Sequence, residues 1–142
     1  MSQFHRNYLL SLVFTSLFLP CLGCGGSSGP DLGKVDGTVT VDGAPIEGAT
    51  VTFQPASGRP SMGITTADGK YSLMYTSEQY GAIPGTHTVS IRTARDQTGG
   101  EGDQPLVEGR AELLPAKYHD ESELTAEVSK GSNTLNFDLT TK

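Results

Sequence analysis

From Val35 to the end of the chain, apolar residues alternate with polar ones at a period of two. This spacing fits a strand with one buried face, because successive side chains of a strand point to opposite sides of a sheet. No window shows sustained helical spacing. The apolar positions fall into seven segments: Val35, Val39 and Val41; Ala49, Val51 and Phe53; Met62 and Ile64; Tyr71, Leu73 and Tyr75; Val89 and Ile91; Leu124, Ala126 and Val128; and Leu135, Phe137 and Leu139. The sequence therefore predicts seven short strands, each with one face in the core.

Turn residues separate these segments. Asp42-Gly43 and Asp68-Gly69 lie between alternating segments, where glycine accepts the positive φ of a tight hairpin, and Pro84-Gly85 marks a further turn. One-faced strands joined by such turns pack best as two sheets face to face. We therefore predict an all-β fold, a seven-stranded antiparallel β-sandwich over residues 34–142.

Residues 94–115 break the alternation and form a long acidic, Gly-rich segment. A loop of this length is uncommon inside a compact domain and is usually functional or disordered, and here we expect disorder. Its acidic residues lack the order found in a loop that wraps calcium.

The length of 142 residues fits one ordinary domain. The formal net charge is -6, from 10 basic and 16 acidic residues, and no window supplies a basic patch. Nucleic acid is therefore excluded as an expected partner, because binding phosphates requires such a patch.

The chain begins with a polar start, an apolar run over residues 9–19, and then Pro20-Cys21-Leu22-Gly23-Cys24. The run has signal-peptide length and is shorter than the roughly 20 residues of a membrane-spanning helix. Its ending resembles the bacterial lipoprotein box, in which a Cys is acylated with chains such as palmitate and becomes the first mature residue. The resemblance implies a signal peptide over residues 1–23, lipidation of Cys24, and a Gly/Ser tether over residues 24–33.

Three alternatives remain for this segment. Cys21 is a second acylation candidate, although Pro20 is a poor neighbour for cleavage. Cys21 and Cys24 also form a CxxC pair, but a redox pair belongs between a strand and a helix of a βαβ unit. The third alternative is a buried N-terminal helix.

Four motifs follow one another along the rest of the chain: VDGTVTVDGAP at 35–45, GATVTF at 48–53, TADGKYSL at 66–73 and PGTHTVSI at 84–91. Together with LPAKY at 114–118, they resemble the carboxypeptidase regulatory-like, or transthyretin-like, β-sandwich module of small bacterial lipoproteins. The resemblance covers roughly residues 34–142, with His87 at a position where the family usually has Tyr. It implies a transthyretin-like or Ig-like sandwich that serves as an accessory module for binding, adhesion or spacing.

Histidine is scarce outside the predicted signal peptide. His87 is in phase with Val89, so we expect a half-buried side chain at a strand end, bonded to a neighbouring loop. His119 precedes Asp120 in a polar turn, where we expect a solvated charge cluster. The two His residues are far apart in the chain, without a short-spaced pair of metal ligands. We therefore expect no catalytic residue, no cofactor and no metal site; an enzyme is the third hypothesis.

Two other kinds of chemistry remain open. Tyr80 and Tyr118 are loop aromatics that, with His87, predict a weak glycan or small-ligand site, because aromatic rings stack on sugar faces. Lys34 with Asn133 or Asn136 suggests a Lys-Asn isopeptide crosslink. The first hypothesis for function is an exported, lipid-anchored, non-catalytic module of the cell envelope, in the cell or outer membrane and facing the periplasm or the surface. Its expected partners are the membrane and an envelope protein or glycan.

Overall fold

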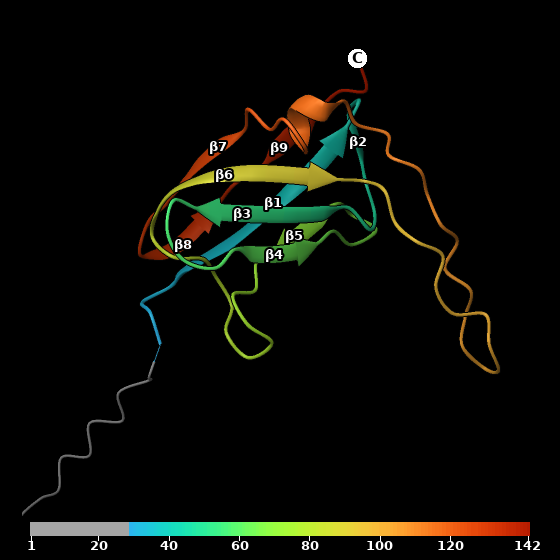
Figure 1. Ribbon diagram of the computed structural model, residues 1–142, viewed down its shortest axis with the longest axis horizontal. Coiled ribbons are helices and arrows are strands. Elements are labelled where there is room, and N and C mark those ends of the chain that lie inside the picture. The colour runs from blue at the N-terminus through green and yellow to red at the C-terminus, as the bar shows by residue number, and fades with distance from the viewer. Residues whose placement is uncertain (1–28) are drawn as a thin grey trace, which may run out of the picture.

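The computed structural model describes residues 29–142, which are nearly all β (Figure 1). The predicted signal peptide, Cys21, Cys24 and most of the predicted tether lie outside the described residues. Within residues 29–142 there is no α-helix, and the strands form two sheets. No helix in this part of the chain is long and apolar enough to cross a bilayer.

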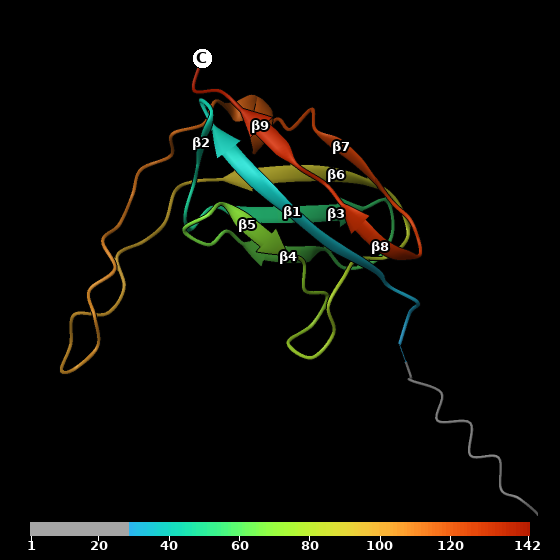
Figure 2. The same ribbon diagram turned by 180° about the vertical axis from the view of Figure 1, so that it is seen from behind.

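The first sheet is built on β1 (Gly33–Val41), as Figure 2 shows. Along one edge of β1, β5 (Lys70–Ser72) and β2 (Ala44–Pro45) pair with it in antiparallel orientation. Along the other edge, β8 (Gly131–Thr134) and β9 (Phe137–Leu139) run parallel to it. The sheet is therefore mixed.

The second sheet is antiparallel throughout and follows the order β4-β3-β6-β7. Its strands are β4 (Ser61–Ile64), β3 (Thr50–Pro55), β6 (Gly85–Arg92) and β7 (Thr125–Val128). A 3-10 turn, η1 (Ala116–Tyr118), lies between β6 and β7 in the sequence. The chain leaves this sheet after β7 and returns to the first sheet as β8 and β9.

The inner faces of the two sheets share one core. Phe53 of the second sheet lies edge-on to Phe137 of the first, with 6.1 Å between ring centroids. The Tyr71 hydroxyl donates a 2.7 Å hydrogen bond to the Leu135 carbonyl, which ties the C-terminal segment to β5. The fully buried side chains confirm the predicted phases of the segments around β1, β3 and β6: Val35, Val39, Val51, Phe53, Val89 and Ile91.

The structure differs from the predicted antiparallel seven-stranded arrangement in two respects. The described residues contain nine strands, because β2 forms a short hairpin with β1 and because β8 forms just before the predicted C-terminal segment, which itself forms β9. The parallel pairing of β1 with these two strands was not predicted. Alternation determines which face of a strand is buried but not which strand lies beside it.

The predicted burial of Met62 and Ile64 is wrong: their exposed fractions are 49% and 67%. Ser61, Gly63 and Thr65 face inward instead. A Cβ on Gly63 would lie 2.6 Å from the Ser72 carbonyl oxygen, so the close approach of the neighbouring segment excludes a larger residue. The inward hydroxyl of Thr65 accepts a hydrogen bond from the Ala49 N–H at 2.9 Å, which satisfies its polar group.

The expectation of disorder for residues 94–115 is also wrong. Most of this segment forms an arm that projects from the two sheets (Figure 1). Arg95 and Arg110 exchange backbone hydrogen bonds of 2.9 and 2.8 Å, and Thr98 and Val107 do the same farther out. The composition of the segment is polar, but paired backbone bonds order it.

Candidate functional site

The three predicted ligand-binding residues do not form one site. Tyr80 belongs to the hairpin between β5 and β6 and is 60% exposed. Tyr118 is in η1, which both views place at the opposite end of the two-sheet body from that hairpin (Figures 1 and 2). His87 lies in the core and is 1% exposed. The structure therefore leaves Tyr80 as the candidate with the most exposed surface.

His87 supports a neighbouring loop. Its Nε2 donates a 2.7 Å hydrogen bond to the Ile83 carbonyl, and its ring lies 5.6 Å from that of Phe53. Among the described residues its Nδ1 has no hydrogen-bond partner. The predicted bond to a loop is confirmed, although burial is deeper than expected. This burial removes His87 from the predicted ligand site.

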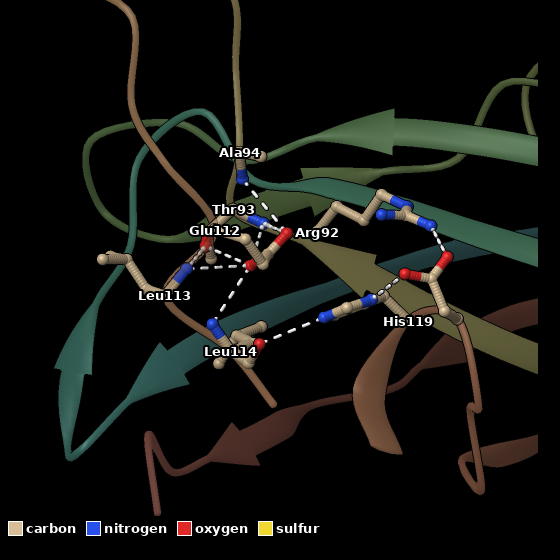
Figure 3. Close-up of polar contacts among 8 residues, drawn as sticks. Arg92, Thr93, Ala94, Glu112, Leu113, Leu114 and His119 are labelled. Atoms are coloured by element: carbon tan, nitrogen blue, oxygen red, sulfur yellow. Dashed lines mark hydrogen bonds and ion pairs between the residues drawn. The ribbon is translucent and has the colours of Figure 1, made fainter. Parts of the chain in front are cut away.

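His119 connects η1 to the neighbouring segments through hydrogen bonds of its ring, as Figure 3 shows. Its Nε2 donates to the Leu114 carbonyl at 3.0 Å, and its Nδ1 lies 2.9 Å from the Asp120 carboxylate. Asp120 also pairs with Arg92 of β6, and these bonds to Arg92 and His119 lower the pKa of Asp120. The imidazole is mostly buried, which corrects the expectation of a solvated cluster.

Glu112 organises the base of the arm (Figure 3). Its carboxylate accepts hydrogen bonds from the backbone N–H and hydroxyl of Thr93 at 3.0 and 2.5 Å. It also accepts N–H bonds from Ala94, Leu113 and Leu114 at 3.0 to 3.3 Å. Burial acts to raise the pKa of Glu112, but the bonds from Thr93, Leu114 and Ala94 outweigh it and lower the pKa to about 2.

Arg110 completes this cluster from the returning side of the arm. Its guanidinium donates to the carbonyls of Thr93 at 2.7 Å and Glu47 at 3.0 Å. Glu112 and Arg110 were not predicted as site residues because their partners at Thr93, Ala94 and Glu47 are distant in the sequence. Both side chains hold the arm to the second sheet.

A hollow of about 610 Å³ opens on the outer side of β1 and β5. Its volume lies in the range of small-molecule sites, about 300 to 1,000 Å³. Asp36 is hydrogen-bonded there to the Ser72 hydroxyl and lies 3.3 Å from the Lys34 amine; these contacts lower the pKa of Asp36. The remaining lining is partly polar and partly apolar: Gly37, Thr38, Ile64, Thr66, Lys70, Tyr71, Met74, Tyr80, Thr134 and Asn136.

One side of this hollow is lined or bordered by four exposed apolar side chains. We call them the apolar row: Met62, Ile64, Met74 and Tyr80. Met62 pairs with Met74 through backbone bonds of 3.0 and 2.8 Å, and Met74 pairs in turn with Tyr80. Side chains of directly paired antiparallel residues lie on the same face. The row is therefore continuous, and the sequence analysis found only Tyr80 as an exposed member.

The described residues do not assemble the other predicted chemistries. No group of three or more His, Cys, Asp or Glu residues within 29–142 could hold a metal ion. The Lys34 amine is exposed beside Asp36, whereas the Asn133 amide donates to the Lys34 carbonyl at 3.0 Å. Asn136 accepts a bond from the Thr38 N–H. These groups do not meet in the buried site that an isopeptide crosslink requires.

Comparisons with known proteins give little. No family model and no curated protein matches the chain. Among solved structures, a DUF3823 family protein from Parabacteroides merdae has a TM-score of 0.40 and 16% identity, covering 79% of this chain and 47% of its own. A 9R-lipoxygenase from Cyanothece has a TM-score of 0.31 and 13% identity, covering 80% of this chain and 17% of its own. This chain thus spans about half the length of the first structure. These comparisons identify no family for it.

Proposed function

We propose that the protein is an exported lipoprotein anchored through acylated Cys24, with a non-catalytic domain that acts as a binding or structural module of the cell envelope. The Gly23-Cys24 ending after a short apolar run supports the anchor. The two sheets with their shared core support a transthyretin-like, carboxypeptidase regulatory-like β-sandwich over residues 34–142. The mature chain then lies on the periplasmic or outer side of a cell membrane or outer membrane.

The non-catalytic role is supported by the contacts that the acid-base side chains make. A catalytic base must reach the proton that it removes from a substrate. Here Glu112, His87 and His119 are engaged with backbone groups that hold loops in place. None of the three lines the hollow beside the apolar row, and Asp36, which does line it, is bonded to the Ser72 hydroxyl and lies 3.3 Å from the Lys34 amine.

Cys24→Ser is expected to move the protein from the membrane fraction to the soluble fraction. Acylation adds about 0.8 kcal/mol per buried methylene, and two or more chains anchor a protein stably. Immunoblots of separated fractions measure the change, and Cys21→Ser is the matched control that should leave the protein on the membrane. Membrane retention of the Cys24→Ser chain, or its loss in Cys21→Ser alone, would count against Cys24 as the anchor.

A second candidate is a weak glycan or small-ligand binder, favoured by the hollow itself. Tyr80 offers an exposed ring for stacking on a sugar, and Asp36, Lys70 and Asn136 offer polar groups. His87 is excluded from this candidate site because it is buried. Tyr118 is excluded because it lies at the other end of the body.

A further inference from the structure

We infer that the apolar row rests on the lipid surface to which the protein is anchored. This inference rests on the proposed lipoprotein anchor and adds an orientation to it. The row holds four of the seven large hydrophobic side chains that are exposed in residues 29–142. Single exposed apolar residues are ordinary, but a contiguous patch marks a contact surface.

The start of the described chain lies beside the row. Gly33 and Ala82 exchange two backbone bonds of 2.9 Å, so β1 begins against the end of the hairpin that carries Met74 and Tyr80. Gly29 lies against the same hairpin, since a Cβ added to this glycine would be 2.7 Å from Nε2 of Gln79. Both views show the chain leaving the body on the hairpin side (Figures 1 and 2).

The tether is too short to carry this face far from the membrane. Gly29 lies five residue steps after Cys24, and a fully extended chain spans about 3.3 to 3.6 Å per step, or at most about 18 Å here. A Gly/Ser chain is on average much more compact than that. The hairpin is therefore the part of the described domain that the lipid anchor holds nearest to the bilayer.

The chemistry of the row suits the bilayer interface. Tyrosine prefers this depth because its ring is apolar and its hydroxyl remains hydrated, and methionine and isoleucine gain by leaving water. Exposed Lys70 lines the hollow beside the row, and Arg59 lies 5.4 Å from the centre of the ring of Tyr75, which follows Met74 in the chain. Basic side chains near a membrane each gain about 1 kcal/mol from anionic lipids. We do not count Lys34 and Lys130 toward this attraction, because they are already paired with Asp36 and Asp31.

The test uses the acylated chain in lipid nanodiscs, with methyl-labelled Met, Ile and Ala, and measures signal broadening by spin-labelled lipid. Met62 and Met74 are the only methionines after the predicted signal peptide, so their signals report directly on the row. Ala44 and Ala116 are exposed and lie in β2 and η1 at the opposite end of the body (Figure 1). A face seated at the headgroup boundary should broaden at least about threefold more than these controls.

Two variants sharpen the result. Tyr80→Ser should reduce the broadening of Met74 by about half, because the ring supplies much of the apolar contact. Leu113→Ser, which changes a residue that is 45% exposed outside the row, should leave it unchanged.

Equal broadening of Met74, Ala44 and Ala116 would overturn the inference. Shifts of Met74 on adding a soluble oligosaccharide, without broadening by lipid, would also overturn it and assign the face to the ligand candidate. Intact mass distinguishes failure of the proposed anchor from failure of the proposed orientation. A chain without acyl groups would rule out the anchor, whereas an acylated chain with uniform broadening would rule out only the orientation.

Discussion

Phe53→Ala is expected to lower the free energy of unfolding by about 3 to 5 kcal/mol. Phe53 is 0% exposed and sits where the two sheets meet. Its ring contacts that of His87 in its own sheet and that of Phe137 in the other. Removing the ring loses its transfer free energy and leaves a cavity that strands held by hydrogen bonds cannot readily close.

Urea denaturation of the full chain measures the change, and Phe137→Ala provides the comparison. Phe137 is only partly buried, so its loss should cost less, about 1 to 3 kcal/mol. A loss below about 1 kcal/mol for Phe53→Ala would mean that β3 does not face the shared core.

Glu112→Ala is the second substitution with a large expected effect, a loss of about 2 to 3 kcal/mol. The carboxylate accepts bonds from the Thr93 hydroxyl and from four backbone N–H groups. The variant would leave the N–H groups of Thr93, Ala94 and Leu114 without this acceptor, whereas the Leu113 N–H keeps its 2.8 Å bond to the Thr93 hydroxyl. The base of the arm should then loosen, although the Arg110 bonds to the carbonyls of Thr93 and Glu47 remain. Amide hydrogen exchange at Thr93, Ala94 and Leu114 should rise more than exchange in β1.

The same carboxylate predicts a pH dependence. Its pKa falls from 4.5 to about 2 on folding, so its contribution to stability is complete above pH 4.5 and lost as the pH falls through about 2. Because the group is partly solvated, we expect about 1 to 2 kcal/mol across this window. Glu112→Gln should flatten the profile, whereas Glu121→Gln, at an exposed carboxyl, should not. An unchanged profile in Glu112→Gln would contradict the hydrogen-bond assignment.

Alternation predicted the buried faces around β1, β3 and β6 because these strands have large neighbours on one side and solvent on the other. It failed at β4, where the backbone near Ser72 approaches so closely that only small side chains face inward. Parallel pairing of β8 and β9 with β1 leaves no mark on the sequence, since it depends on the path of the chain after β7.

The candidate site was predictable only in part. Tyr80 was expected on a loop and is exposed, but its neighbour Met62 was assigned to the core with the phase of β4. The Glu112 cluster could not be foreseen, because Thr93 and Ala94, which donate to its carboxylate, meet it only when the arm folds back towards the end of β6. Polar composition suggested disorder there, whereas five hydrogen-bond donors meet at one carboxylate.

The lipid anchor is tested by the intact mass of the native protein from the membrane fraction. We expect a chain that begins at Cys24 and carries acyl groups. Export, the lipid anchor and the absence of a free thiol in the mature chain would then follow together. An unmodified chain that retains both Cys21 and Cys24 would contradict the account and return the CxxC pair to consideration as redox or metal chemistry.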